Sequence, residues 1–307
     1  MGDEIKVYQK RYVTASDIAK FLGVEIYGND VQIKTVKSIG DVSENVLVFS
    51  KGKVEEELLK NVGQVCFIAS ELPDFIGNNA FIVVENPRLA FAKSLSEFFV
   101  EKKTPGIGKN SVIHPTAEIG KSVIIGNGCT IGKNVVIGDD TEIRNNVVIA
   151  DGVQIGRHCF IKSNTVIGEK GFGFDFEKDG TPVELPHLNS VQIGDYVEIG
   201  AVNTIVGGTL KNTIIHSHVK TDDHVHIAHN CVVGSKTIIT ACSEVSGSVT
   251  IGEKCWLGPN CSIMNKINIG NNCFIGLGAV VIKDVPPGAV MAGNPAKIIK
   301  MQGGGEK

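Results

Sequence analysis

The chain has 307 residues, a length that fits about two domains. Its 30 basic and 33 acidic residues give a formal net charge of −3, which excludes the broad basic surface typical of nucleic-acid-binding proteins. Hydrophobic residues make up 42% and charged residues 21% of the chain, as in folded globular proteins, and no apolar stretch is long enough to form a transmembrane segment. The eight cysteines include no Cys-x-x-Cys pair, so we expect free thiols and a cytoplasmic location.

Residues 1–103 predict a small α/β domain. Thr14 is expected to cap a short helix that Gly23 ends, because threonine favours the position before a helix and glycine the position after it. The remaining segments predict, in chain order, strands at 31–33 and 46–49, a helix at 55–60, strands at 65–69 and 80–84, and a helix at 88–100.

A six-residue repeat begins at Ile107 and continues to Val281. The aliphatic residue, most often isoleucine, recurs at 107, 113, 119, 125, 131, 137, 143, 149, 155, 161 and 167, at 193, 199 and 205, and every six residues from 215 to 281, with Thr221 as an interruption. A period of six fits neither a helix nor a hairpin and is typical of a parallel β-helix, in which three short strands form a coil of 18 residues. We expect this β-helix at 104–285 and a short tail at 286–307, so the predicted fold class is mainly β.

Six of the eight cysteines occupy one position of the repeat. Each stands four residues after the aliphatic residue of the register, namely Cys129, Cys159, Cys231, Cys255, Cys261 and Cys273. This position takes a small residue inside the coil, and cysteine behaves there as a small hydrophobe. We therefore predict that these thiols fill the core rather than bind metal or act in redox chemistry.

The repeat breaks twice. The first break, the insertion 168–191, carries Phe172 and Phe174 between glycines, and an insertion in a β-helix projects as a loop on one face. The two rings either pack back onto the wall of the β-helix or form a substrate loop that contacts a ligand or a neighbouring subunit. The second break, at 206–210, contains adjacent glycines that allow a tight excursion.

Histidines gather between residues 216 and 229. Ile227 is the inward residue there, so the His229 ring is expected to face outward at the following corner, next to Gly247 one coil later. Because Gly247 has no side chain, a substrate can approach, and a backbone N–H is available to it. An imidazole beside an exposed amide is the minimum for general-base acyl transfer with an oxyanion site. Asp222 or Asp223 is a candidate for orienting the ring.

Two other interpretations of the histidines stay open. His226 belongs to the same patch as a supporting candidate, and the whole patch is alternatively a surface feature without a role. His224 and His229 have the H-x4-H spacing that resembles the γ-class carbonic anhydrases, which are zinc enzymes. A zinc site needs three protein ligands, and no histidine stands near Ile193, where the third is expected. The sequence therefore favours acyl transfer without a metal or cofactor.

From about residue 13 to 285 the chain resembles the UDP-3-O-acylglucosamine N-acyltransferase (LpxD) family. The resemblance is carried by the order of the two domains and by four segments: NPRLAFA at 86–92, GFGF at 171–174, GDYVEIGA at 194–201 and IAHN at 227–230. The hexapeptide repeat alone is less specific, because many acetyltransferases share it.

This resemblance implies a left-handed β-helix homotrimer with active sites between subunits. It implies His229 as the general base that deprotonates the amine of a nucleotide-linked amino sugar, which attacks an acyl thioester in lipid A or other surface-glycan biosynthesis. Asn230 would support the base, and the backbone N–H of Gly247 would stabilise the oxyanion. The N-terminal domain would hold the nucleotide, with Phe49 retained from the family's pattern.

The chain also departs from the family. Lys266 stands where the family has a second active-site histidine, and Pro-His-Leu-Asn at 186–189 replaces Pro-Gln-Leu-Gly. The segment at 206–209 differs from the family's Asp-Arg-Gly-Ala, and the end of the chain at 293–300 resembles acetyl-CoA-dependent sugar acetyltransferases. These departures leave the donor open between acyl-ACP and acyl-CoA, leave open which nucleotide amino sugar is the acceptor, and keep O-acetyl transfer as an alternative.

Overall fold

The structure, a computed structural model, describes residues 12–302 and divides the chain into two compact units, Met1–Lys103 and Thr104–Lys307. Each unit has its own hydrophobic core. No helix within residues 12–302 is long and apolar enough to cross a membrane.

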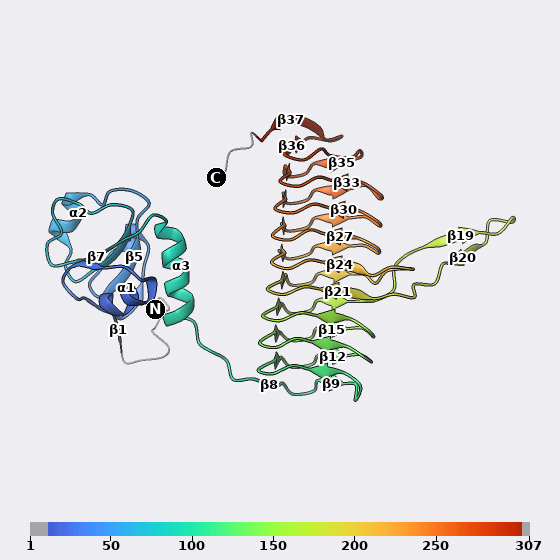
Figure 1. The fold of residues 1–307 in the computed structure, drawn as a ribbon, viewed down its shortest axis with the longest axis horizontal. Coiled ribbons are helices and arrows are strands. Elements are labelled where there is room, and N and C mark those ends of the chain that lie inside the picture. Colours follow the sequence, from blue (N-terminus) through green and yellow to red (C-terminus); the bar gives the residue numbers. More distant parts are fainter. Residues whose placement is uncertain (1–11, 303–307) are drawn as a thin grey trace. The chain divides into compact units, whose positions relative to one another are not determined.

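The first unit is a sheet with helices on both faces (Figure 1). Its strands run in the order β2-β7-β6-β5-β4, antiparallel between β2 and β7 and parallel elsewhere, and a separate pair joins β1 to β3. The elements are β1 (Val13–Thr14), α1 (Ala15–Leu22), β2 (Ile26–Gly28), β3 (Gln32–Ile33), β4 (Thr35–Val36), the 3-10 helix Ile39–Asp41, β5 (Val46–Phe49), α2 (Glu56–Asn61), β6 (Cys66–Ala69), β7 (Ala80–Val83) and α3 (Pro87–Phe98).

Residue alternation along the strands decides which helix covers which face. Leu47 of β5 packs in the same cluster as Ile18 of α1, whereas its neighbour Val46 packs with Leu59 of α2. The predicted caps are confirmed. The Thr14 hydroxyl accepts a 3.1 Å hydrogen bond from the N–H of Asp17, and Gly23 ends α1 with φ 71°.

The second unit is a stack of short strands in three sheets, which confirms the predicted parallel β-helix (Figure 1). One sheet contains β8 (Gly106–Ile107), β11 (Ile124–Ile125), β14 (Glu142–Ile143), β17 (Phe160–Ile161), β22 (Glu198–Ile199), β25 (Lys220–Thr221), β28 (Ile238–Ile239), β31 (Trp256–Leu257), β34 (Phe274–Ile275), β36 (Ala289–Ala292) and β37 (Lys297–Met301). The next contains β9 (Val112–Ile113), β12 (Thr130–Ile131), β15 (Val148–Ile149), β18 (Val166–Ile167), β23 (Thr204–Ile205), β26 (His226–Ile227), β29 (Glu244–Val245), β32 (Ser262–Ile263) and β35 (Val280–Val281). The third contains β10 (Glu118–Ile119), β13 (Val136–Ile137), β16 (Gln154–Ile155), β21 (Val191–Ile193), β24 (Thr213–Ile215), β27 (Val232–Val233), β30 (Thr250–Ile251) and β33 (Asn268–Ile269).

The aliphatic residues of successive coils pair in register and fill the interior. Across the first break Ile155 pairs with Ile193, and across the second Ile205 pairs with Ile227, so both excursions leave the stack intact. Most residues of the register are buried, but Ile107 is 60% exposed because it lies in the first coil. Burial of each aliphatic side chain contributes about 1.5–3 kcal/mol to the stability of the fold. A single coil cannot bury these side chains by itself, so the stability comes from stacking.

The structure confirms that the six cysteines of the repeat fill the core. All six are free and buried. Burial raises the pKa of the Cys231 thiol to about 12, so this thiol is protonated at neutral pH.

The corners between sheets need a left-handed backbone. The residue three places after the aliphatic residue has a positive φ at corner after corner, as at Asn134 (54°), Asn146 (56°) and Asn230 (61°). Asparagine tolerates this conformation better than most side chains. The repeat therefore turns the chain sharply immediately after His229.

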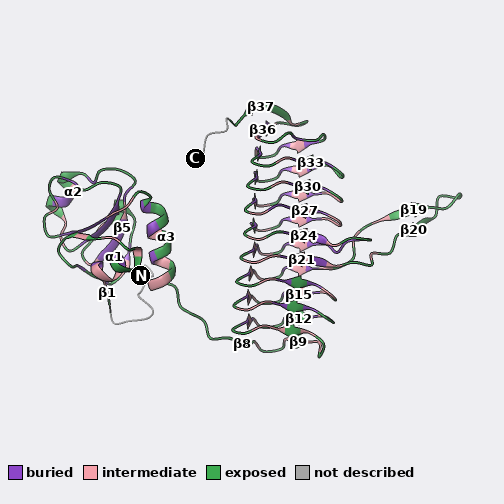
Figure 2. Ribbon diagram, in the orientation of Figure 1, coloured by how far each residue is buried: buried purple, intermediate pink, exposed green. Residues whose placement is uncertain are grey.

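The structure departs from the expected solenoid at the insertion and at the C-terminal end of the stack. The insertion forms a hairpin of β19 (Phe174–Phe176) and β20 (Pro182–Glu184), which projects from the stack and is largely exposed (Figure 2). The sheets also extend beyond residue 285, where the sequence predicts a tail: β36 adds to β34 in parallel, and β37 pairs with β36 in the antiparallel direction.

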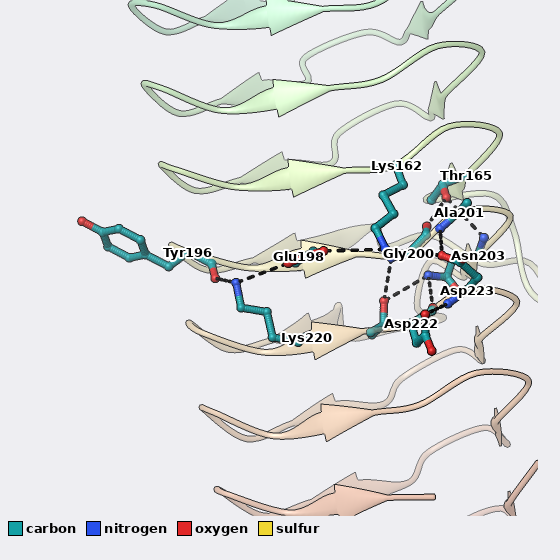
Figure 3. A network of polar contacts seen from close by, with 11 residues as sticks. Lys162, Thr165, Tyr196, Glu198, Gly200, Ala201, Asn203, Lys220, Asp222 and Asp223 are labelled. Carbon is teal, nitrogen blue, oxygen red and sulfur yellow. Dashed lines mark hydrogen bonds and ion pairs between the residues drawn. The ribbon is translucent and has the colours of Figure 1, made fainter. Parts of the chain in front are cut away.

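At Thr221 a buried polar residue takes the place of the aliphatic residue of the register. Its hydroxyl oxygen accepts hydrogen bonds from the N–H of Gly200 (3.1 Å) and the Asn203 side-chain amide (3.0 Å), and that amide also donates to the carbonyl of Asp222 (3.0 Å). Asn203 and its surroundings are drawn in Figure 3. A polar residue is tolerated here because its hydrogen-bonding capacity is used.

We predict that Thr221→Val destabilises the protein by about 1–3 kcal/mol, because the two donors lose their acceptor inside the stack. Urea unfolding followed by circular dichroism measures the change. Thr221→Ser keeps the hydroxyl, so its free energy of unfolding should fall clearly less. Equal losses in both variants would show that packing of the methyl group, and not the hydrogen bonds, determines the effect.

Candidate active site

His229 lies at the corner between β26 and β27 and is half-buried. Its Nδ1 is 2.8 Å from Oδ1 of Asn230, the next residue. The ring is thus neither enclosed in the core nor free in solvent, which agrees with the predicted outward position.

Asn230 fixes which nitrogen of His229 carries the proton. Its side-chain Nδ2 donates to the carbonyl of Lys211 (3.1 Å), so the other atom of the amide is the oxygen. That oxygen also accepts from the N–H (3.2 Å) and the hydroxyl (2.9 Å) of Thr209. Because an amide oxygen only accepts, Nδ1 of neutral His229 is the protonated nitrogen, and Nε2 has a free lone pair, as a general base requires.

Gly247 lies directly against that lone pair. A Cβ atom at this position would be 2.6 Å from Nε2 of His229 and 2.7 Å from Cε1, so only glycine leaves the nitrogen accessible. The N–H of Gly247 has no acceptor among residues 12–302. At the same repeat position, Lys109 and Lys121 each donate their N–H, at 2.7 Å, to an Asn or Asp one coil later. Gly247 therefore offers a free donor beside a free base.

The two breaks in the repeat join to support this corner. The N–H of Leu188 donates to the carbonyl of Thr209 (2.9 Å), and the N–H of Asn189 donates to that of Gly208 (3.0 Å). Thr209 in turn holds Asn230. Sequence reasoning missed Thr209. The available signal was its position in the second break, where the chain departs from the family's pattern.

The insertion also brings a second imidazole to the site. The rings of His187 and His229 have centroids 5.2 Å apart and planes at 76°. Gly171, from the other arm of the insertion, lies close to both: a Cβ there would be 2.5 Å from Nε2 of His187 and 3.1 Å from Cβ of His229. The sequence shows His187 in place of the family's glutamine and within the insertion, away from the position expected for a third zinc ligand, and gives it no role.

The prediction that Asp222 or Asp223 orients His229 is wrong. Asp223 lies at the preceding corner, where its carboxylate accepts from the N–H of Ala201 (2.7 Å) and lies 3.5 Å from Nζ of Lys162 (Figure 3). The bond from Ala201, followed by the charge of Lys162, lowers the pKa of this carboxyl. The role expected of an acid is taken by the neutral Asn230.

The other predicted residues lie around the site or outside it. His226 is on β26, in register with Thr204 and Glu244, and is half-buried. Lys266 is exposed one coil beyond Gly247, to whose carbonyl its N–H donates (3.0 Å). Phe49 belongs to the first unit, where its ring centroid is 5.0 Å from that of Phe91.

The two phenylalanines of the insertion do not pack onto the wall of the β-helix. Phe172 is 87% exposed and Phe174 44%, and their rings contact each other with centroids 4.8 Å apart. Exposed aromatic rings on a projecting loop are typical of a contact surface.

The zinc interpretation finds no support in the geometry. His224 lies at the corner before β26 and His229 at the corner after it. Within the described range 12–302, no group of three His, Cys, Asp or Glu side chains is placed to hold a metal ion.

Comparison with known proteins agrees with this geometry. The family model "GMPPB C-terminal domain" matches residues 107–171, and "Bacterial transferase hexapeptide (six repeats)" matches 248–283. The UDP-3-O-acylglucosamine N-acyltransferase of Campylobacter lari is 42% identical over 257 residues, which cover 79% of this chain and 80% of that protein. The enzyme of the same name from Campylobacter curvus is 41% identical with the same coverage. The chain belongs to this family.

Solved structures show the same relationship for the β-helix. LpxA from Acinetobacter baumannii superposes with a TM-score of 0.58 at 29% identity, covering 64% of this chain and 74% of that one. The UDP-N-acetylglucosamine acyltransferase of Francisella novicida superposes with a TM-score of 0.59 at 32% identity, covering 64% of this chain and 70% of that one. The fold is a left-handed parallel β-helix and the protein is an acyltransferase, as the sequence predicts, and the comparisons do not support the zinc alternative.

We predict that Gly247→Ala lowers kcat of the enzyme at least about 100-fold, because the added Cβ displaces the imidazole from its position. The backbone of Gly247 has no positive φ, so alanine fits the chain itself. Steady-state kinetics measure the change, and a thermal melt close to that of the parent protein shows an intact fold. In a His229→Ala background Gly247→Ala should lower kcat almost no further. A full additional loss of kcat there would contradict a clash with the His229 ring as the cause.

We predict that Thr209→Val lowers kcat about threefold to tenfold, because the hydroxyl bond to Asn230 is lost while the backbone bond remains. The KM values should stay unchanged, since Thr209 acts on the base rather than on a substrate. Thr209→Ser should restore kcat. A serine variant as slow as the valine variant would exclude the hydroxyl as the cause.

Proposed function

We propose that the enzyme transfers an acyl group from an acyl thioester to the amine of a UDP-linked amino sugar, as in lipid A biosynthesis, with His229 as the general base. The observation that supports this proposal most directly is the free Nε2 lone pair of His229 against Gly247. The relatives' shared name gives the acceptor class, a UDP-3-O-acylglucosamine.

The reaction has two proton transfers, and both use one nitrogen. As the sugar amine attacks the thioester carbonyl, a C–N bond forms and Nε2 of His229 takes a proton from the amine. The tetrahedral intermediate then breaks its C–S bond, and the departing thiolate takes that proton from Nε2. Asn230 remains hydrogen-bonded to Nδ1 throughout and stabilises the imidazolium with its carbonyl oxygen.

The N–H of Gly247 is the proposed donor to the oxyanion. A backbone donor without a partner does not have to break another hydrogen bond when negative charge develops on the carbonyl oxygen. One such donor contributes about 100-fold or more to kcat. Gly247 thus has two roles in the proposal: its missing side chain leaves Nε2 of His229 accessible, and its N–H donates to the oxyanion.

The remaining elements of the proposal concern partners. We place the enzyme in the cytoplasm as a homotrimer in which the exposed Phe172 and Phe174 contact a neighbouring copy or the donor's acyl chain. The nucleotide is held by the first unit, with Phe49 as the candidate ring. The donor is acyl-ACP or acyl-CoA, and acyl-transfer assays with both distinguish them.

We predict that His229→Gln lowers kcat about 100-fold to 10,000-fold with the acceptor KM little changed, because glutamine fills a similar volume but is not a base near neutral pH. Product formation from UDP-3-O-acylglucosamine with acyl-ACP and with acyl-CoA measures it, and a melting temperature near that of the parent protein controls for folding.

Turnover above one tenth of the parent rate in this variant would exclude His229 as the base. If the parent protein acylates hydroxyl acceptors and no amines, the reaction is O-acyl transfer and not N-acyl transfer.

A further inference from the structure

His187 carries a buried acceptor that nothing in the described chain uses. Its Nδ1 lies 3.0 Å from the carbonyl oxygen of Leu185, two residues earlier. Because a carbonyl only accepts, Nδ1 carries the proton and Nε2 has the lone pair. This Nε2 is inaccessible to solvent and has no hydrogen-bond partner within residues 12–302. A buried polar atom without a partner costs about 1–3 kcal/mol, so the position calls for a ligand or a function.

The ring that carries this nitrogen lies against the ring of the base. The His187 ring meets the His229 ring edge to face with centroids 5.2 Å apart, and Gly171 lies close to the His187 ring and to Cβ of His229. In each imidazole a hydrogen bond made at Nδ1 leaves Nε2 as an acceptor. The two neighbouring rings therefore present two acceptors, and the N–H of Gly247 is a free donor beside one of them.

We propose that His187 is a substrate-binding residue whose Nε2 accepts a hydrogen bond from the second N–H of the reacting amine. This inference rests on the proposed function. A primary amine has two N–H groups: His229 removes the proton from one, and His187 holds the other, which directs the nitrogen lone pair at the thioester carbonyl. A hydroxyl has one O–H, which it donates to the base His229, so it leaves His187 unpaired and the two acceptors together select amines over alcohols.

The insertion is built to allow this contact. A Cβ at Gly171 would be 2.5 Å from Nε2, so the proposed contact requires the arm that carries Gly171 to move aside when the amine enters. That arm carries the exposed Phe172. Two residues before Gly171 it is joined to the second break, because the N–H of Gly207 donates to the carbonyl of Glu169 (2.9 Å). His187 itself stays fixed, because the N–H groups of Leu188 and Asn189, the next two residues, are bonded to the second break.

Two substitutions separate the acceptor from the shape of the ring. His187→Gln keeps an acceptor oxygen, whereas His187→Phe keeps a ring and removes the acceptor. We expect His187→Phe to raise both KM and Kd for UDP-3-O-acylglucosamine about tenfold or more, with the donor KM unchanged, and His187→Gln to stay within about threefold. His216→Phe and His216→Gln, at an exposed histidine after β24, are the matched controls. Thermal melts verify folding.

Two further readouts make the assignment specific. Calorimetry with UDP-3-O-acylglucose, the hydroxyl counterpart, should give the same Kd for His187→Phe and the parent protein. In ¹⁵N spectra of the imidazoles, binding of the amine sugar should shift Nε2 of His187 and leave His216 unchanged.

The inference is overturned if His187→Phe binds the amine sugar like the parent protein, if His187→Gln loses as much as His187→Phe, or if both sugars are weakened equally. A parent protein that binds the amine sugar without transferring an acyl group contradicts the proposed function alone, and the binding comparison then still decides the role of His187. A parent protein that does not bind the sugar contradicts both.

Discussion

The stacking of aliphatic side chains at intervals of one coil is the constraint on which the rest of the structure depends. Each complete coil contributes three register residues and the smaller side chains four places after them, and their apolar surface is removed from water only by the coils on either side. The chain must therefore return to register after every excursion, as it does when Ile155 pairs with Ile193 and Ile205 with Ile227. This requirement confines variation to the corners and outer surface, where it leaves the core unchanged.

The active site uses the freedom that the constraint leaves. Both excursions leave the stack near the corner that carries His229, and they bond to each other through Leu188 and Thr209. Thr209 then holds Asn230, which sets the tautomer of the base. The rigid coils supply the position of the imidazole, and the irregular segments supply the partners that select its protonated nitrogen and cover it. Loops held by a regular scaffold commonly divide the work in this way.

Neutral groups, rather than charges, prepare the base. The nearby carboxylate of Asp223 is already engaged by Ala201 and Lys162 at another corner (Figure 3). An amide oxygen fixes the imidazole tautomer without adding a negative charge to a half-buried site, where an unpaired carboxylate would be costly. The same logic applies to His187, whose proton is fixed by a backbone carbonyl.

The sequence by itself determined the solenoid, the inward residues, the core cysteines and the outward position of His229, because a strict period of six fixes which side chains face inward. It also determined the caps of α1, which depend on residues close together in the chain. Only the tertiary structure decided what surrounds the imidazole. Thr209, His187 and Gly171 lie between 20 and 58 residues from His229, inside segments without periodicity, so no spacing rule places them. Their contacts depend on how two irregular segments fold against one corner. Asp223, though only six residues away, lies at the preceding corner because strand β26 separates it from His229.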